Sequence, residues 1–83
     1  MINIVLFGRL SDFANEVNLT VEFAADNATP YLIRANLSLL NPALGEQLRE
    51  PQILVSVNRV MVGWEQPISD GDEVAFLPPV TGG

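Results

Sequence analysis

The chain has 83 residues, 48% of them apolar, and its formal net charge of −6 comes without a single cysteine, histidine or lysine. One domain of this size buries only about 60% of its unfolded surface, so it has a core but no room for a deep pocket. These absences argue against disulfides, a thiolate nucleophile and an autonomous enzyme, while the negative charge argues against nucleic-acid binding and favours a basic partner.

Membrane association is not expected from the sequence. No stretch approaches the roughly 20 consecutive apolar residues of a membrane span. The first residues also lack the basic segment followed by an apolar one that marks a signal peptide. We therefore expect a cytoplasmic protein.

The chain begins with a segment that alternates as a strand does over residues 2–7. Its two faces carry different sets of apolar residues, Ile2, Ile4 and Leu6 against Val5 and Phe7. After a polar connection over residues 12–18, a second alternation over residues 19–23 predicts a half-buried strand that pairs with the first.

A helix start follows, because Thr29 can cap and Pro30 suits the first helical position. An apolar stripe then recurs at spacings of four, three and four residues, formed by Ile33, Leu37, Leu40 and Leu44. The pair Asn41-Pro42 interrupts it, so we expect a helix from about Pro30 to Leu40 and a short second turn from Pro42 to Arg49. We expect Ile33, Leu37 and Leu40 in the core, and the arginines as scattered surface charges.

The remaining segments complete a sheet. Alternation predicts a strand over residues 53–57, a minor strand over residues 60–62 and a last strand over residues 73–77. The order strand, strand, helix, strand, minor strand, strand indicates an α+β fold, with a mixed sheet of about five strands and one main helix across one face. This is the order of the β-grasp (ubiquitin-like) fold, whose first and last strands are central neighbours, and we assign it residues 1–77.

Acidic residues gather just before the last strand, at Asp70, Asp72 and Glu73. They lack the ligand spacing of a calcium loop, and Gly71 stands where a turn needs a positive φ. We therefore expect a solvated turn here and no metal site.

The most informative segment is the terminus Pro78-Pro79-Val80-Thr81-Gly82-Gly83. The two prolines end a sheet ladder and favour an extended rod, and the two glycines, which lack a Cβ, can enter a narrow passage. Six residues at full stretch reach about 20 Å, enough to enter a partner's active site. We expect residues 78–83 to form a flexible tail whose reactive group is the α-carboxylate of Gly83.

The pair Val57-Asn58, then Pro67, and the run from Asp70 to Gly83 resemble the small, sulfur-carrying subunit of molybdopterin synthase, in the ubiquitin-like MoaD/ThiS family. Residues 5–10 are a weaker match. The resemblance implies that an adenylating activating enzyme uses ATP on the Gly83 carboxylate and that sulfur then replaces the adenylate, giving a thiocarboxylate. The loaded tail, residues 78–83, would enter the large subunit and donate sulfur to cyclic pyranopterin monophosphate.

The same resemblance has consequences for assembly. It implies a chain that binds no cofactor, is not an enzyme on its own, and acts as the non-catalytic, sulfur-donating subunit of a sulfurtransferase. It also implies a heterotetramer of two small and two large subunits. Phe7, Met61 and Leu77 fall by alternation on the sheet face away from the helix, and we expect them to dock the large subunit because aromatic residues and methionine are enriched at interface cores.

Other functions remain open. The chain could carry sulfur for thiamine, cysteine or tRNA thiolation, could modify proteins through isopeptide bonds from Gly83, or could be an interaction module with an inert terminus. The stretch Pro78-Pro79-Val80-Thr81 favours the molybdopterin branch. Without lysine, the chain cannot build lysine-linked chains of itself.

Overall fold

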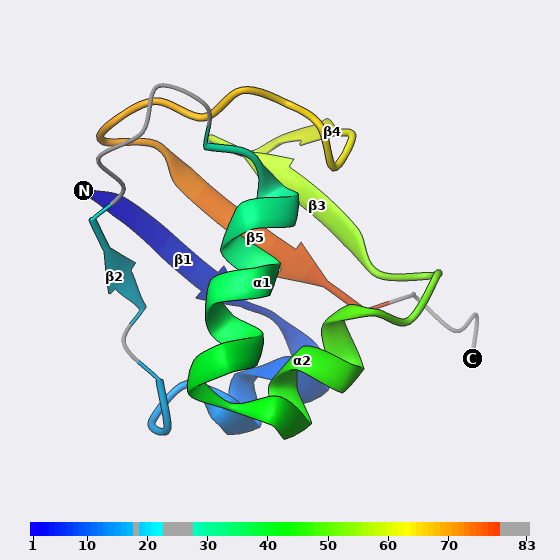
Figure 1. Cartoon of the computed structure of the whole chain (residues 1–83). Coiled ribbons are helices and arrows are strands. Elements are labelled where there is room, and N and C mark those ends of the chain that lie inside the picture. The colour runs from blue at the N-terminus through cyan, green and yellow to red at the C-terminus, as the bar shows by residue number, and fades with distance from the viewer. Residues whose placement is uncertain (18, 23–27, 79–83) are drawn as a thin grey trace.

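The computed structural model describes residues 1–17, 19–22 and 28–78. Five strands form one mixed sheet, and two α-helices and one 3₁₀ helix accompany it (Figure 1). In chain order the elements are β1 (Ile2–Leu6), the 3₁₀ helix η1 (Gly8–Phe13), β2 (Thr20–Val21), α1 (Pro30–Leu40), α2 (Pro42–Leu48), β3 (Leu54–Val57), β4 (Val60–Val62) and β5 (Glu73–Leu77).

The sheet has the strand order β2-β1-β5-β3-β4. The first and last strands of the chain lie at its centre and run parallel, with Ile4 opposite Val74 and Leu6 opposite Phe76. The other neighbours are antiparallel. This is the β-grasp arrangement that the element order predicted.

The two α-helices begin at caps that the sequence supplies. The Thr29 hydroxyl accepts from the backbone N–H of Leu32 at 3.3 Å, and the Asn41 side-chain carbonyl accepts from the N–H of Leu44 at 3.1 Å. Each cap is followed by a proline at the first helical position, where its missing N–H costs nothing. The Asn41-Pro42 pair therefore ends α1 and starts α2, as predicted, and α2 ends one residue early because Arg49 is its C-cap.

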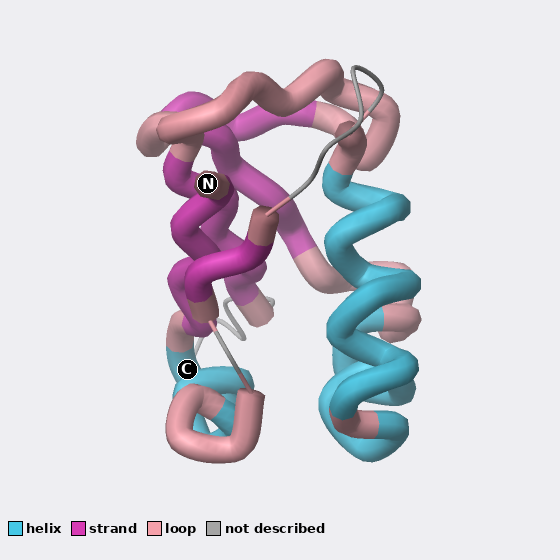
Figure 2. The backbone as a smooth tube through the Cα atoms, turned by 60° about the vertical axis from the view of Figure 1, so that its left-hand side comes forward, coloured by secondary structure: helices cyan, strands magenta, loops and turns pink. Residues whose placement is uncertain are grey.

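Both α-helices cover the same face of the sheet, as the side view shows (Figure 2). The core between these layers consists of Ile2, Ile4, Leu6, Leu10, Ala28, Ile33, Leu37, Leu44, Leu48, Ile53, Val55, Val57, Ile68, Val74 and Phe76. The prediction that Leu40 joins this core is wrong, because its side chain is 58% exposed. At that end of α1 the residue lines a surface hollow together with Val21 of β2, so part of its side chain faces solvent.

The polar connection was predicted to begin near Asp12, but the chain after β1 first forms η1, which inserts a fully buried Leu10 into the core. This 3₁₀ helix packs against α2 and against β1 and β5. The apolar residues of η1, Leu10 and Phe13, lie three positions apart, and a run this short does not indicate a helix by its period. The predicted second strand is confirmed over Thr20–Val21, whereas its last residue, Phe23, lies outside the described residues.

An aromatic stack closes one side of the core. The Trp64 ring stacks on Phe76 and on Tyr31, with centroids 5.5 Å and 5.7 Å apart. The Arg34 guanidinium lies 5.0 Å from the Trp64 centroid and 5.1 Å from that of Tyr31. Arg34 is therefore a packed cation–π residue and not one of the scattered surface charges that we expected.

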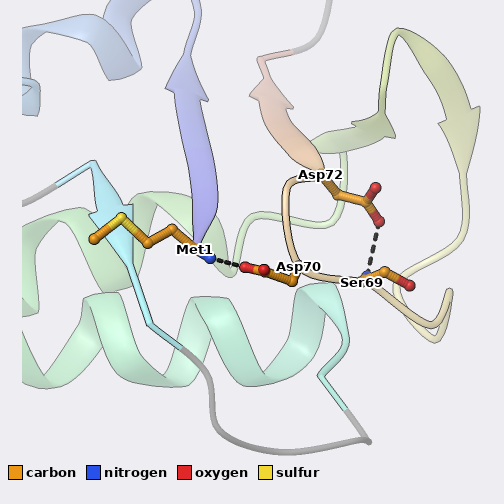
Figure 3. A network of polar contacts seen from close by, with 4 residues as sticks. All are labelled: Met1, Ser69, Asp70 and Asp72. Atoms are coloured by element: carbon orange, nitrogen blue, oxygen red, sulfur yellow. Dashed lines mark hydrogen bonds and ion pairs between the residues drawn. The ribbon is translucent and has the colours of Figure 1, made fainter.

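The turn before β5 ties the start of β1 to the rest of the sheet (Figure 3). The Met1 amine pairs with the Asp70 carboxylate, the Met1 carbonyl accepts from the Gly71 N–H at 2.7 Å, and Gly71 has φ of 90°. The carboxylate of Asp72 accepts from the N–H of Ser69 at 2.8 Å. The acidic residues thus build a turn, and nowhere in residues 1–17, 19–22 and 28–78 do three or more potential metal ligands gather.

Within the same described ranges, neither α-helix has the length and hydropathy needed to cross a membrane.

Candidate functional site

The face of the sheet opposite the helices carries a row of four side chains. Strand register places Val5 beside Ala75, Ala75 beside Ser56, and Ser56 beside Met61. The two central residues of this row are small, and both are buried, whereas Val5 and Met61 at its ends are larger. The sheet is therefore hollowed along its middle, on a face that neither α-helix covers.

This open-face hollow has a volume of about 420 Å³. Its lining consists of Val5, Phe7, Ser56, Arg59, Met61, Glu73, Ala75 and Leu77. Phe7 and Leu77 lie toward the C-terminal end of β5, while Glu73 lies at its start. Phe7 is 48% exposed and Met61 53%, so large apolar groups stand in solvent around a small-residue floor. Such an arrangement suits the side chain of a partner.

The structure brings together the three residues that the sequence predicted as a docking patch, Phe7, Met61 and Leu77. Sequence reasoning missed the floor, Ser56 and Ala75, and the charged rim, Arg59 and Glu73. The strand alternation already placed Ser56 on this face. What the alternation could not give is the register that brings two small residues side by side.

A two-residue hairpin turn between β3 and β4 places Arg59 at the rim. Asn58 and Arg59 have φ of 51° and 68°, the pair of positive values typical of a tight hairpin turn. Asn58 fixes the turn to β5, since its side-chain carbonyl accepts from the Glu73 N–H at 3.0 Å and its amide donates to Asp72 at 2.9 Å. Arg59 then lies with its Nε 4.0 Å from a Glu73 carboxylate oxygen.

The electrostatics of this rim are those of an exposed surface. The N–H of Ser69, and secondly the side-chain amide of Asn58, hold the pKa of Asp72 below its usual value because both donate to the ionised carboxylate. Arg59 and Glu73 are the ionisable groups of the hollow. With no cysteine or histidine in the chain, the lining has neither a thiolate nor an imidazole base. The arrangement can bind a partner, but its residues do not form a catalytic constellation.

The tail that the sequence singled out begins where β5 ends. Leu77, a hollow residue, is followed by the half-buried Pro78. Pro79, Val80, Thr81, Gly82 and Gly83 lie outside the described residues, so their predicted roles in insertion and sulfur carriage remain predictions. The described part of the chain nevertheless places the base of this segment at the end of the hollow that Phe7 and Leu77 form.

The fold and its open face define a ubiquitin-like protein of the β-grasp class. Residues 4–83 match the ThiS family, and the chain belongs to that family. It is 34% identical to the molybdopterin synthase sulfur carrier subunit of Escherichia coli (strain K12) and 30% identical to the subunit of the same name from Haemophilus influenzae, over 100% of each chain. Among solved structures, small archaeal modifier protein 1 of Haloferax volcanii superposes with a TM-score of 0.78 at 26% identity, covering 95% of this chain and 97% of that one.

Proposed function

We propose that this protein is the sulfur carrier subunit of a molybdopterin synthase. The observation that carries the proposal is its end-to-end similarity, at 34% identity, to a protein of that name. The open-face hollow supports it, because a carrier must dock on the enzymes that load and unload it. The composition is compatible with the proposal as well, since a thiocarboxylate at the terminus needs no cysteine side chain.

The reactive group in this proposal is the α-carboxylate of Gly83. A carboxylate is a poor electrophile, so an activating enzyme first joins it to AMP from ATP, releasing pyrophosphate. Sulfur at the sulfide level (HS⁻) from the donor then attacks the acyl carbon, AMP leaves, and a thiocarboxylate remains on Gly83. In the large subunit the thiocarboxylate sulfur would bond to a carbon of cyclic pyranopterin monophosphate as an oxygen substituent leaves that carbon. Water would then cleave the bond between this sulfur and the Gly83 acyl carbon, which restores the carboxylate, and a second loaded carrier would supply the second sulfur.

The remaining residues of the tail would guide it. Pro78, Pro79, Val80 and Thr81 stiffen and direct the chain, and Gly82, which lacks a Cβ, lets the backbone pass through a narrow channel. The catalytic bases and acids would come from the partner, because this chain contributes no histidine. The chain itself would therefore be the non-catalytic part of a sulfurtransferase and would bind no cofactor, with ATP consumed by the activating enzyme.

Docking would use the open-face hollow. Phe7, Met61 and Leu77 would contact the large subunit, in a heterotetramer of two small and two large subunits in the cytoplasm. A partner side chain in the hollow would bury apolar surface of Phe7 and Met61 that now faces water. Because one end of the hollow lies beside Pro78, a partner bound there would lie next to the base of the tail.

The test is the intact mass of the protein after incubation with its activating enzyme, ATP and a sulfur donor. We expect a gain that corresponds to one sulfur in place of one oxygen, absent from a variant that lacks Gly83. The loaded protein should then convert the pterin precursor when the large subunit is added. Loading followed by no transfer to the pterin would redirect the proposal to a carrier of another pathway, such as thiamine, cysteine or tRNA thiolation.

A second function is favoured by one observation, the likeness to a solved structure whose protein is called a modifier. As a ubiquitin-like modifier, this chain would form isopeptide bonds from Gly83 to amines of other proteins. In cells, such conjugates would appear as high-mass species that disappear when Gly83 is deleted. A sulfur carrier would give the loaded free protein and none of these species.

A further inference from the structure

The base of the C-terminal segment rests on the backbone of Gly8. A Cβ built on Gly8 would lie 2.6 Å from Cγ of Pro78 and 3.4 Å from its Cδ, so the proline ring occupies the space in which any other residue would place a side chain. Gly8 also has φ of 57°, a left-handed conformation that glycine adopts without steric cost. Two independent features therefore favour glycine at this position.

Hydrogen bonds of the residues around Gly8 fix the backbone that the Pro78 ring contacts. The Phe7 N–H donates to the Phe76 carbonyl at 3.1 Å, which fixes the end of β1 to β5 just before the proline. On the other side, the Gly8 carbonyl accepts from the Ser11 hydroxyl at 2.7 Å, and the Leu10 N–H donates to the Phe7 carbonyl at 3.1 Å. The residue on which Pro78 rests is thus the first of η1, and the residue before it, Phe7, is hydrogen-bonded to β5.

From this contact we infer that Gly8 is a positioning residue, which aims the C-terminal segment through Pro78. The ring of Pro78 fixes its own φ near −65°. Because the next residue is also a proline, the ψ of Pro78 is restricted to extended values. A ring seated on Gly8 therefore defines, relative to the sheet, the direction in which the chain leaves Pro78.

The consequence for function rests on the proposed sulfur carriage. A segment that already points along one direction loses less conformational entropy when it enters a partner's active site. Gly8 lies beside Phe7, so the same stretch of chain would contribute to docking through Phe7 and to aiming through Gly8. Neither residue would touch the reacting carboxylate.

The chain offers matched control positions for this inference. Gly71 has φ of 90°, but no other atom lies within 4 Å of the place that its Cβ would take, so Gly71→Ala introduces the backbone strain without the contact. Gly63 has neither feature, and Gly63→Ala reports the change of residue type alone. Pro78→Ala removes Cγ and Cδ and leaves a Cβ that lies 4.0 Å from the one added at Gly8, an ordinary contact.

The first experiment needs no sulfur chemistry. Because the chain has no cysteine, Gly83→Cys gives a unique site for a nitroxide spin label. The label broadens the amide signals of whichever residues the tail approaches. We expect Gly8→Ala to change that set of residues and Gly71→Ala to leave it unchanged. If the label broadened the signals of the same residues in the Gly8 and Gly71 variants, the inference would be overturned. This result does not depend on whether the protein carries sulfur.

The second experiment measures loading of Gly83 by the activating enzyme. Gly8→Ala should raise the KM of the activating enzyme for this protein and lower its kcat/KM by about tenfold. This is the scale expected when one more backbone residue must be ordered on binding. A purely structural defect would instead lower the amount of loadable protein at unchanged KM. In the Pro78→Ala background, the effect of Gly8→Ala should disappear.

An equal effect of Gly8→Ala in both backgrounds would overturn the positioning role in loading. Failure of the unsubstituted protein to load would count against the proposed function, and the spin-label result would still decide whether Gly8 aims the tail.

Discussion

The two faces of the sheet are built from the same strands and differ in what covers them. On the covered face, Ile4, Val55, Val74 and Phe76 are all at most 3% exposed beneath the helices. On the open face, Phe7 and Met61 are about half exposed, although they are as apolar as the core residues. The comparison teaches that the apolar side chains of the open face are not needed to form the core. Their grouping around a hollow supports the docking surface that we propose.

The largest effect expected from this comparison is on the covered face. Ile33 is fully buried between α1 and the sheet, so Ile33→Ala removes packed methyl and methylene groups and leaves a cavity. We expect the free energy of unfolding to fall by about 2–5 kcal/mol. Urea unfolding followed by circular dichroism measures this change.

The matched change on the open face is Met61→Ala. Its side chain is 53% exposed, so its truncation should cost less than about 1 kcal/mol of unfolding free energy. Losses of equal size at Ile33 and Met61 would contradict the distinction between the two faces.

The second prediction sharpens the comparison through binding. Phe7→Arg places a charge on the rim of the open-face hollow without disturbing the core, because this side chain points away from the helices. Affinity for the large synthase subunit should fall at least about tenfold, as for a buried aromatic anchor of an interface. Calorimetric titration measures the dissociation constant.

Leu39→Arg is the control, since Leu39 is 86% exposed and belongs to α1, on the other side of the sheet. Unchanged affinity of the Phe7 variant, or equal weakening by the Leu39 variant, would remove the hollow from the docking surface.

The sequence predicted the features that depend on residues close together in the chain. The bounds of α1 were predictable because Thr29, Pro30 and Asn41-Pro42 act on their immediate neighbours. The faces of β1 and β3 were predictable because alternation is also local. The floor of the hollow was not, since it depends on Ala75 meeting Ser56 across two strands.

The failures have the same cause. Leu40 shares the stripe of α1, but its burial depends on which distant segments pack against that end of the helix, which no local pattern records. The seat of Pro78 on Gly8 joins residues at opposite ends of the chain through the parallel pairing of β1 and β5. Long-range register, which the local pattern does not contain, therefore decides the details of the site.

A third, smaller effect concerns the aromatic stack at the side of the core. Arg34→Gln removes the guanidinium that lies over Trp64 and Tyr31. We expect a loss of about 1 kcal/mol in unfolding free energy, the scale of a partly exposed cation–π contact. Arg49→Gln, at an exposed C-cap, should cost less. A loss no larger at Arg34 than at Arg49 would show that the stack does not depend on the cation.

The smallest effect is electrostatic and lies at the turn before β5. The N–H of Ser69 and the amide of Asn58 lower the pKa of Asp72 in the folded protein. A lowered folded pKa contributes stability above the unfolded pKa, about 3.9, and that stability is lost as the pH falls through the folded value. Asp72→Asn should therefore cost about 0.5–1 kcal/mol at pH 7, given the exposure of the site, and progressively less below about pH 4.

Urea unfolding of both proteins between pH 7 and pH 2 tests this linkage, with Asp12→Asn as an exposed control in η1. If the Asp72 difference kept its full size at pH 2, the contribution would come from the shape of the turn and not from the charge. That outcome would also change how the rim is understood. Asn58 would then hold Arg59 beside the hollow through neutral hydrogen bonds alone, and docking on the open face should be insensitive to protonation of Asp72.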